Sequence, residues 1–519
     1  MKKVLPLSIF LFTSPVIFAQ VPNWSDQVAK IIYNNCSNCH REGGIGPFTL
    51  MSYDDAVTNS YGMSAQVAEK LMPPWKANPD YVHFQDERFL SDQDIEIIQD
   101  WVNGGMPSGN LADAPPPPVF NSISQMPVID QTLQLPSWTV NTDIDQYRSF
   151  VIPAGASAGK YLNQIEYQPG NNAIVHHIVI WADPTNISQT LDDLDPLPGF
   201  ESNGTMPASL FSSLIGAWAP GSGLFKLPEN MGIKIQANYD YVVEIHYAPG
   251  SMNQSDSTKI NLKFTESPAI REVFVDAVLE YFFGMTDGPL FVPANTVRTF
   301  HEAYDLNGYN LSLIGVFPHM HRVGTSFKSW AENSSGAITP LIDIPKWSFH
   351  WQGFYNYQKL VPVFSGTTIW GEATYDNTTN NPDNPNNPPQ DVEAGEHTTD
   401  EMMIGFFAYT EYQTGDENLI LDSTLITGAN TIQASDLSLQ LFPNPASHQL
   451  TVSLALPKSG QTVFEMYDIN GSLVRYLSID LLNEGIHTTS IPVNDLSNGM
   501  YLLKIQTEGK VEVRKFVKE

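Results

Sequence analysis

The spacing of apolar residues separates a helical beginning from a long β-rich remainder. Within residues 20–110 the apolar positions recur at helical intervals, as in the amphipathic stretch 25–33. Ser91 is placed to cap a second helix, and Gly104-Gly105 to end it. The apolar face of that second helix carries Ile95, Ile98 and Trp101. The pattern therefore predicts a small α-helical domain.

From about residue 136 to 430 the chain changes to short runs in which apolar and polar residues alternate, as at 241–247. Turn residues separate these runs, which predicts β-sandwiches. Residues 111–135 form a Pro-rich linker, stiffened by four consecutive prolines at 115–118. The Asn- and Pro-rich stretch 376–391 predicts a long irregular loop.

The last segment, residues 437–519, alternates again and predicts a C-terminal β-sandwich. A chain of 519 residues is too long for one ordinary core, so three or four domains are expected. The expected fold class is therefore multidomain, with one helical domain and several β-sandwiches.

Charge and the first residues bear on where the protein works. A basic start at Lys2 and Lys3, an apolar run and the small residue Ala19 predict a signal peptide over residues 1–19, rather than a membrane anchor. No later stretch predicts a transmembrane segment. The net charge of −30 argues against nucleic acid as a partner, because phosphates need basic residues.

The motif Cys36-Ser37-Asn38-Cys39-His40 predicts covalently bound haem c. Two thioether bonds fix the porphyrin, and His40 reaches the iron from the same turn. A redox dithiol would leave His40 without a role. A zinc site needs four ligands, and the chain has no further cysteine.

The sixth haem ligand is expected from a separate segment, and Met72 in Leu71-Met72-Pro73-Pro74-Trp75 is the preferred candidate. Two prolines stiffen that backbone, and a thioether ligand favours reduced iron, which suits electron transfer. Met63 and Met106 are the competing methionines, and a core position for Met72 is the alternative. The whole helical segment resembles small class I c-type cytochrome domains.

Five histidines and one methionine form the candidate copper set. Adjacent strand residues face opposite sides, so two neighbouring histidines can bind one ion only at a strand end or bulge. A His-x-His pair on a strand faces one side and can chelate a metal, although zinc also accepts that spacing. A thioether favours Cu(I) and leaves room for dioxygen. The set comprises His176, His177, His246, His319, His321 and Met402.

This set resembles, in order, the ligand motifs of the type II copper-dependent monooxygenases, the family of peptidylglycine α-hydroxylating and dopamine β-monooxygenases. The likeness covers roughly residues 140–425 and all six ligand positions. The matching segments are Val175-His176-His177-Ile178, Glu244-Ile245-His246-Tyr247, Pro318-His319-Met320-His321 and Asp400-Glu401-Met402.

The resemblance implies two jelly-roll-like β-sandwich copper domains, residues 136–275 and 276–430, that face a solvent-filled cleft. It implies two copper ions. His176, His177 and His246 would hold the copper that stores an electron. His319, His321 and Met402 would hold the copper that activates dioxygen and hydroxylates a C–H bond.

Two departures from the family pattern change this picture. The animal enzymes are disulfide-rich, whereas these domains contain no cysteine. The positions that hold the carboxylate and backbone of a peptide substrate are here Phe317, Ile404 and Phe406. An unpaired carboxylate against such a wall is costly, so an apolar or aromatic small molecule is the expected substrate. The other histidines are expected to be structural or exposed: His83, His301, His350, His397, His448 and His487.

Residues 437–519 resemble the C-terminal sorting domains of type IX secretion cargo. The likeness rests on the opening Phe442-Pro443-Asn444-Pro445, a Gly-x-Tyr strand at 499–501 and a basic final segment. It implies the type IX secretion machinery as a partner, and a secreted or outer-surface protein that passes through the periplasm. A carbohydrate-binding sandwich is the alternative.

The function expected from the sequence is a secreted, haem-fused copper monooxygenase. It would use dioxygen, a small-molecule substrate and an external electron donor, and the haem domain would relay electrons to copper. The linker suggests a tethered relay without a strong docking interface. A non-catalytic haem and copper electron carrier, and a zinc hydrolase with a cytochrome appendage, are the alternatives.

Overall fold

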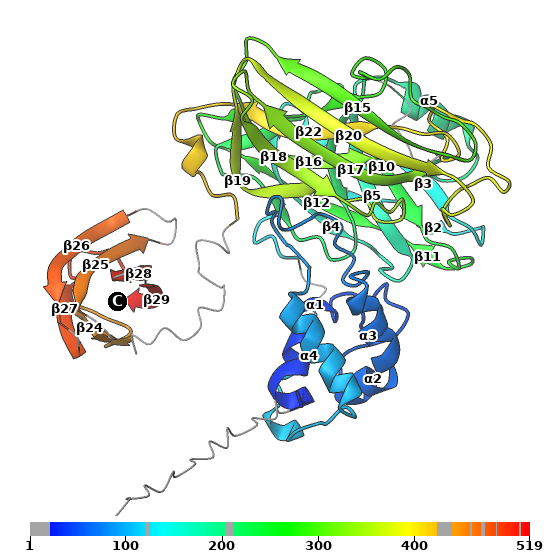
Figure 1. The fold of residues 1–519 in the computed structure, drawn as a ribbon. Coiled ribbons are helices and arrows are strands. Elements are labelled where there is room, and N and C mark those ends of the chain that lie inside the picture. The colour runs from blue at the N-terminus through cyan, green and yellow to red at the C-terminus, as the bar shows by residue number, and fades with distance from the viewer. Residues whose placement is uncertain are drawn as a thin grey trace, which may run out of the picture. The chain divides into compact units, whose positions relative to one another are not determined.

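The computed structural model describes residues 21–120, 124–202, 209, 211–422, 439–456, 459–468, 473–483, 485–507 and 510–519. The predicted signal peptide and the first two residues of the predicted C-terminal domain lie outside them. The chain divides into two compact units (Figure 1). The first comprises Met1–Tyr357 with Val361–Thr414, and the second comprises Gln358–Leu360 with Gly415–Glu519. Strands are the predominant secondary structure, in several sheets.

The first unit begins with a helical module, residues 21–114. Its core packs apolar faces around the buried rings of Trp24 and Trp101. The predicted helix after Ser91 is confirmed: the Ser91 hydroxyl accepts from the backbone N of Asp94, and Gly104 is the C-cap. The helices are η1 (Trp24–Val28), α1 (Ala29–Asn35), α2 (Tyr53–Thr58), α3 (Ser60–Ala68), α4 (Asp92–Asn103) and η2 (Leu111–Asp113).

The N lobe, residues 131–265, is the first β part of this unit. Its five-stranded sheet has the order β6-β3-β10-β5-β7 and carries the first group of histidines. Its elements are β1 (Gln131–Gln134), β2 (Trp138–Thr139), β3 (Gln146–Pro153), η3 (Gly155–Ser157), β4 (Tyr161–Gln168), β5 (Val175–Asp183), α5 (Ile187–Leu194), β6 (Phe200–Glu201), β7 (Ser213–Trp218), β8 (Phe225–Lys226), β9 (Met231–Lys234), β10 (Asp240–Tyr247), β11 (Ser255–Asp256) and β12 (Lys259–Thr265).

The C lobe, residues 271–411, is the second β part. It contains a four-stranded sheet of order β15-β20-β17-β18. Its strands are β13 (Arg271–Glu280), β14 (Phe291–Val292), β15 (Thr296–Leu306), β16 (Leu311–His319), β17 (Gly324–Glu332), β18 (Ile338–Ile344), β19 (Tyr355–Val363), β20 (Thr367–Asn377), β21 (Val392–Glu393) and β22 (Ile404–Glu411).

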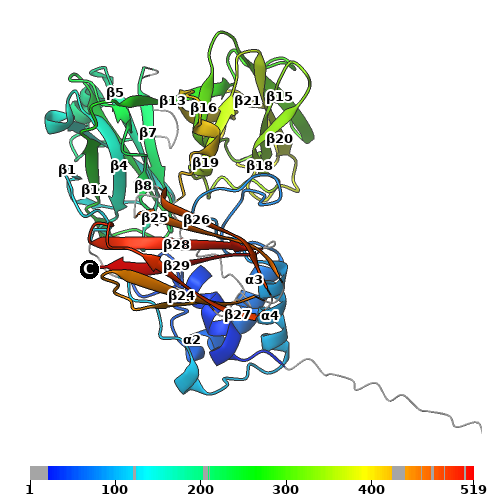
Figure 2. The same cartoon turned by 90° about the vertical axis from the view of Figure 1, so that its left-hand side faces the viewer.

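A single nine-stranded sheet runs through both lobes, in the order β1-β12-β4-β9-β13-β22-β16-β19 with β8 paired to β4. Strand β13 makes the connection. Its first residues, 271–273, pair in parallel with β9 of the N lobe, and residues 274–280 pair antiparallel with β22 of the C lobe. Figure 2 shows the two lobes side by side with β13 at their junction. Backbone hydrogen bonds therefore join the lobes.

The predicted boundaries hold at some points and shift at others. Strand β10 matches the alternation at 241–247, and residues 378–391 form the predicted irregular loop between β20 and β21. The region predicted as linker is shorter than expected. Strand β1 lies inside it and pairs with β12, so the N lobe begins at Gln131.

The helical module is packed against the C lobe. Phe84, which is 1% exposed, stacks on Tyr357 at 5.4 Å between ring centroids and lies 5.2 Å from the Tyr355 ring. The backbone N of Gln85 donates to the oxygen of Asn356 at 2.7 Å, and its side chain donates to the oxygen of Tyr357 at 2.8 Å. The expectation of a tether without a docking interface is therefore wrong.

The second unit ends in two sheets, of order β23-β24-β27 and β26-β25-β28-β29, around one apolar core that includes Phe464, Leu503 and Phe516. Its elements are η4 (Asp416–Asn418), β23 (Gln440–Phe442), β24 (Gln449–Leu456), β25 (Gly460–Asp468), β26 (Leu473–Leu482), β27 (Gly485–Pro492), β28 (Gly499–Thr507) and β29 (Lys510–Lys518).

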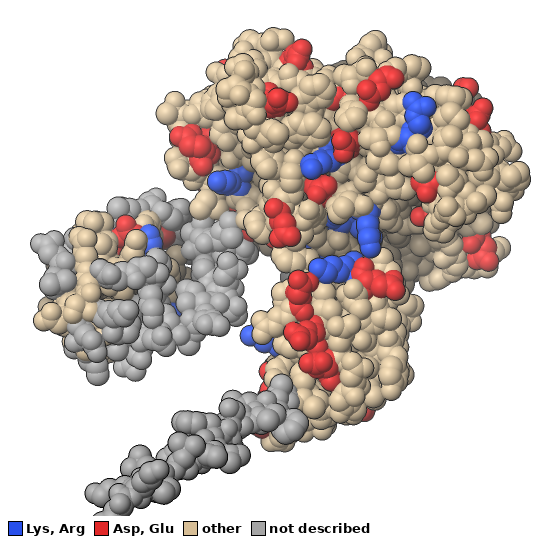
Figure 3. Space-filling model, in the orientation of Figure 1, with Lys and Arg blue, Asp and Glu red and all other residues tan. Residues whose placement is uncertain are grey.

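Surface charge and helix length complete the description. Acidic side chains are spread over the face of the first unit in Figure 3, with a few small basic groups, in keeping with the net charge of −30. None of the helices in the described part of the chain has the length and apolarity needed to cross a membrane.

Replacing Phe84 with alanine should loosen the helical module from the C lobe. Removing a buried phenylalanine ring costs about 3–5 kcal/mol. The backbone amide of Gln85, which donates across the interface, should then exchange faster in hydrogen-exchange mass spectrometry. Tyr61→Ala, at an aromatic residue of the same module that is 74% exposed, is the control. Unchanged exchange in Phe84→Ala would contradict a packed interface.

Candidate metal centres

The first centre lies where β5 and β10 lose their regular pairing. His246 on β10 is opposite His177 on β5, but the next residue, Tyr247, is opposite Val175. His176 is therefore the extra residue of a β-bulge, which lets both neighbouring histidines turn to one side. The sequence predicted a strand end or a bulge here, and the bulge is confirmed.

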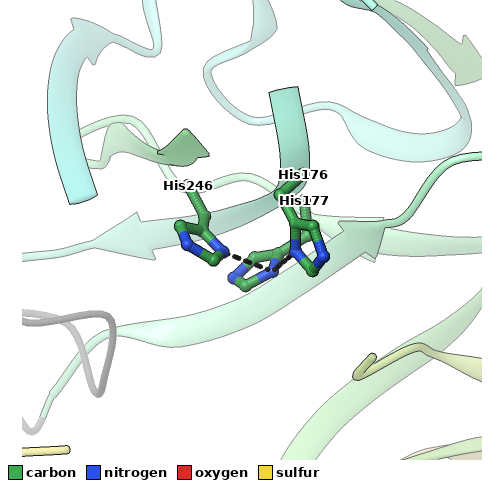
Figure 4. Close-up of side chains that lie close together, drawn as sticks. All are labelled: His176, His177 and His246. Carbon is green, nitrogen blue, oxygen red and sulfur yellow. Dashed lines mark hydrogen bonds between the residues drawn. The ribbon is translucent and has the colours of Figure 1, made fainter. Parts of the chain in front are cut away.

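The three imidazoles of this centre converge, as Figure 4 shows. The Nδ1 atom of His177 lies 3.3 Å from Nδ1 of His176 and 3.3 Å from Nδ1 of His246. One ligand nitrogen from each ring falls within 4.8 Å of the other two. Such a set of nitrogen atoms fits a single metal ion, and imidazole is a ligand for copper and for zinc.

Burial keeps these rings neutral, as metal ligands must be. Loss of solvation, reinforced by neighbouring histidines, lowers the pKa of His176 to about 3 and moves the pKa of His177 well below 6.5. Burial also lowers the pKa of His246, although the Asp145 carboxylate acts against that change. Asp145 accepts from Nε2 of His246 at 2.7 Å, which leaves the lone pair on Nδ1, facing the centre.

The second centre is formed by His319 and His321, whose ring centroids are 5.2 Å apart. The prediction that both lie on one strand is wrong, because β16 ends at His319 and His321 is in the following turn. The Nδ1 atom of His319 contacts Oε1 of Gln352 at 2.7 Å, and that of His321 contacts the backbone oxygen of Asp400 at 3.1 Å. Both Nδ1 atoms are therefore donors.

The Nε2 atoms of these two rings fit a metal ion. Both are buried and have no hydrogen-bond partner among the described residues. Burial, with the neighbouring imidazole second, lowers the pKa of His319 to about 3, and burial lowers the pKa of His321 to about 4. A buried lone pair without a donor is costly, and a bound cation removes that cost.

Glu401 ties the backbone at Met402 to the backbone at His321. Its Oε2 atom accepts from the backbone N of His321 at 2.9 Å and from that of Met402 at 3.2 Å, and Oε1 accepts from Val323 at 2.8 Å. Met402 is fully buried, and Ile404 pairs with His319 across β22 and β16. The Asp400-Glu401-Met402 segment is thus held against the His319–His321 turn. Sequence analysis assigned Glu401 no role.

One pocket is shared by the two centres. His177 and His319 both line it, together with Trp181, Phe317 and Phe406. The rings of Trp181 and Phe406, from opposite lobes, lie 5.8 Å apart. Aromatic side chains therefore line part of the pocket that the two centres share. Ile404, the third position of the expected apolar wall, is also buried.

The Cys-x-x-Cys-His motif follows directly after α1. The backbone N of His40 donates to the oxygen of Cys36 at 3.0 Å, and both cysteines are free thiols. His40 Nδ1 contacts the backbone oxygen of Phe48 at 3.1 Å, which leaves Nε2 available. A Cβ on Gly46 would lie 2.7 Å from that Nδ1, so the close approach requires glycine. Two thiols and an oriented imidazole fit covalent haem.

The methionine candidates for the sixth haem ligand have different surroundings. Met63 is part of the apolar core of the helical module, and Met106 packs beside that core. Met72 is 40% exposed and lines a cavity with Phe89 and Leu90. The alternative that Met72 is a core residue is therefore wrong. Met72 remains the preferred candidate for the sixth haem ligand.

Three of the other six histidines, His83, His301 and His487, have ordinary polar partners. His83 contacts Glu87, and His301 lies between Asp287 and Glu372. His350 differs, because its ring centroid is 6.5 Å from that of His176. His350 thus lies beside the first centre, and the expectation that it is structural or exposed stays a prediction. No sequence motif marks it, since the contact joins segments of two different lobes.

Comparisons with known proteins identify the end of the chain. Residues 440–519 match the family described as "Secretion system C-terminal sorting domain". This bears out the predicted type IX sorting domain, and the protein is directed to the outer cell surface or beyond. No curated protein matches the chain.

Solved structures show only remote likeness. PNGase F from Flavobacterium meningosepticum is 9% identical over 55% of this chain and 97% of its own, with a TM-score of 0.23. The β-glucuronidase of Parabacteroides merdae is 8% identical over 43% of this chain, with a TM-score of 0.13. The chain spans about 28% of that β-glucuronidase. Scores this low carry no argument about fold or activity.

Glu401→Gln should weaken metal binding at the second centre. The amide nitrogen would face backbone N–H groups, which leaves a buried donor unpaired at a cost of about 1–3 kcal/mol. Isothermal titration with Cu(I) should show weaker binding at one site only, with the three-histidine centre unchanged. Glu393→Gln, at an exposed residue of β21, is the matched control. Equal affinities in all three proteins would contradict the role of Glu401.

His319 and His321 should destabilise the metal-free protein as the pH falls from 6.5 toward 4. The folded-state pKa values of His319 and His321 lie below 6.5, so the unfolded chain binds more protons in this window. The contribution of these two rings to the free energy of unfolding then decreases with decreasing pH, whereas buried carboxyls with raised pKa values, such as Glu401, act in the opposite direction. Urea denaturation at several pH values measures this, and a His319→Gln/His321→Gln variant should show a smaller slope. Equal slopes would contradict the argument.

Proposed function

We propose that this protein is a secreted copper monooxygenase with a built-in haem electron relay. The observation that carries the proposal is the pair of buried imidazole centres on one pocket. His177 of the first centre and His319 of the second both line that pocket, His176 and His246 converge on His177, and His321 lies beside His319. The backbone segment that carries Met402 is hydrogen-bonded through Glu401 to His321.

Copper is favoured over zinc by the donor set and by the neighbouring module. The ligands are imidazoles and a thioether, without a carboxylate, and a thioether selects Cu(I). Zinc has no redox chemistry, so it could not accept electrons from a haem module in the same compact unit. When bound, copper supplies one-electron chemistry and dioxygen activation, and haem c supplies a one-electron relay.

The surrounding residues orient the ligands and exclude water. Asp145, Gln352 and the Asp400 carbonyl fix which nitrogen of each imidazole carries the proton. Glu401 holds the Met402 segment against the His321 turn. The rings of Trp181, Phe317 and Phe406 line the pocket that His177 and His319 share, and they limit the room for water there.

The pocket lining supports an apolar or aromatic substrate. It contains Phe317 and Phe406 and, among the described residues, neither lysine nor arginine. Glu244 is its acidic side chain, and burial raises the pKa of that carboxyl to about 7. A substrate carboxylate would therefore meet no cation, whereas a neutral ring or alkyl chain would replace water against aromatic surfaces.

The test combines metal analysis with isotope-labelled dioxygen. Protein matured in a haem-attaching host should bind two copper ions per chain and one covalent haem. With an external electron donor and a panel of apolar molecules, it should transfer one labelled oxygen atom into a product. Tight zinc binding with no redox-active copper would favour a hydrolase and would contradict the proposal.

Met402→Leu should abolish product formation while leaving electron transfer from haem to copper intact. Leucine keeps the apolar volume but removes the sulfur ligand. Mutation of a residue that only hydrogen-bonds to a metal ligand lowers metal affinity or activity by about 10–100-fold. Loss of a direct ligand should therefore lower product formation by more than about 100-fold. Met403→Leu, at the adjacent buried methionine, is the matched control.

The same assay separates the enzyme from an electron carrier. Fast haem-to-copper transfer with no oxygenated product from any substrate in the panel, in the unmodified protein, would favour a non-catalytic carrier. Full product formation in Met402→Leu would remove Met402 from the reacting site.

A further inference from the structure

The segment between β18 and β19 reaches both metal centres. Two of its residues, His350 and Gln352, contact different groups of histidines. His350 places its ring centroid 6.5 Å from that of His176 in the first centre. Gln352 accepts from Nδ1 of His319 in the second centre. The segment belongs to the C lobe, so it brings C-lobe side chains to a centre that the N lobe builds.

Trp351, between these two residues, connects the first centre with the helical module. Its ring centroid lies 6.4 Å from that of His176, with the ring planes at 84°. On its other side, the guanidinium carbon of Arg88 lies 5.8 Å from the ring centroid. Trp351 is thus in contact distance of a metal-centre imidazole and of a helical-module cation.

Arg88 in turn lies beside the Cys-x-x-Cys-His motif. Gly221 lies against both, since a Cβ built on it would lie 3.0 Å from the guanidinium carbon of Arg88. Arg88 Nη1 donates to the Pro220 oxygen at 2.7 Å. A Cβ on the next residue, Gly221, would lie 3.3 Å from the Asn38 side chain, so the motif itself reaches this loop.

We propose that Trp351 is the bridge for electron transfer between the haem-binding segment and the three-histidine centre. The proposal rests on the proposed function. With haem held by Cys36, Cys39 and His40, and copper held by His176, His177 and His246, the bridge would carry one electron from reduced haem to oxidised copper. No bond forms or breaks and no proton moves. The aromatic ring supplies a polarisable path through contacts that already exist, and the Arg88 guanidinium holds it in place.

A competing path follows the backbone from Pro220 to Trp218 and the N lobe. Pro220 accepts from Arg88, and Trp218 is paired with Ile178 at the edge of β5. That path reaches β5 beyond His177, whereas Trp351 contacts the His176 ring directly. The two paths differ in whether they need the indole ring, so substitution of that ring distinguishes them.

The experiment uses the full chain with covalent haem and two bound Cu(II) ions. A laser flash reduces the haem through a small photoexcited flavin, and haem absorbance then follows its reoxidation. Trp351→Leu should slow this phase by about tenfold or more, equivalent to about 1.4 kcal/mol on the barrier. Trp351→Phe keeps a ring and should lie between Trp351→Leu and the unmodified protein.

Trp347→Leu is the matched control, because this tryptophan lies on the same segment and its backbone N is bonded to Thr325. Electron paramagnetic resonance and the haem spectrum should show both copper sites and the haem unchanged in the variants. A rate in Trp351→Leu equal to that of the unmodified protein would overturn the proposal. So would an equal slowing in Trp347→Leu. If Trp351→Leu does not bind copper, Trp351→Phe and Arg88→Met decide by the same criterion.

The flash experiment can fail or succeed independently of the test for the monooxygenase activity. A slowed electron-transfer phase in Trp351→Leu, in a protein that forms no oxygenated product, would support the bridge and count against the monooxygenase. Product formation with no flash-induced transfer from haem to copper in the unmodified protein would count against the bridge and the haem relay, but not against the monooxygenase.

Discussion

The structure depends on one constraint: an imidazole lone pair removed from water must meet a proton or a metal ion. Five histidines in two neighbouring centres are placed under that constraint, and burial holds the pKa values of their rings below 6.5. The bulge at His176 exists because two neighbouring strand residues cannot otherwise face one point. The contacts from Asp145, Gln352 and Asp400 each determine which nitrogen of an imidazole carries the proton.

Local patterns in the sequence were sufficient to predict part of the fold and of the two histidine centres. The cap at Ser91, the alternation along β10 and the need for a bulge at His176-His177 follow from period and adjacency, and each is confirmed. The place of His321 was wrong because strand alternation assumes that the strand continues, whereas β16 ends at His319. Glu401, His350 and Trp351 gave no signal, since their partners lie on segments far away in the chain.

The relation between the helical module and the lobes was also beyond pattern analysis. A Pro-rich linker predicts separation, yet Phe84 is 1% exposed between Tyr355 and Tyr357, and backbone hydrogen bonds link Gln85 to Asn356. Apolar residues in a short irregular segment show no helical or strand periodicity. Their burial against another domain therefore cannot be predicted from the sequence pattern. The motif residues are consequently held at one position beside Arg88 and the Pro220 loop.

Strand β13 is shared between the lobes, pairing with β9 at its start and with β22 over the rest of its length. A hinge needs a flexible connection, and this one is a continuous hydrogen-bonded ladder. Opening the lobes as rigid bodies would break that ladder. Access for small molecules must therefore come from side-chain and loop movements. Either lobe produced alone would expose an unpaired strand edge, and such edges promote aggregation. The two lobes should therefore be expressed and engineered together as one unit.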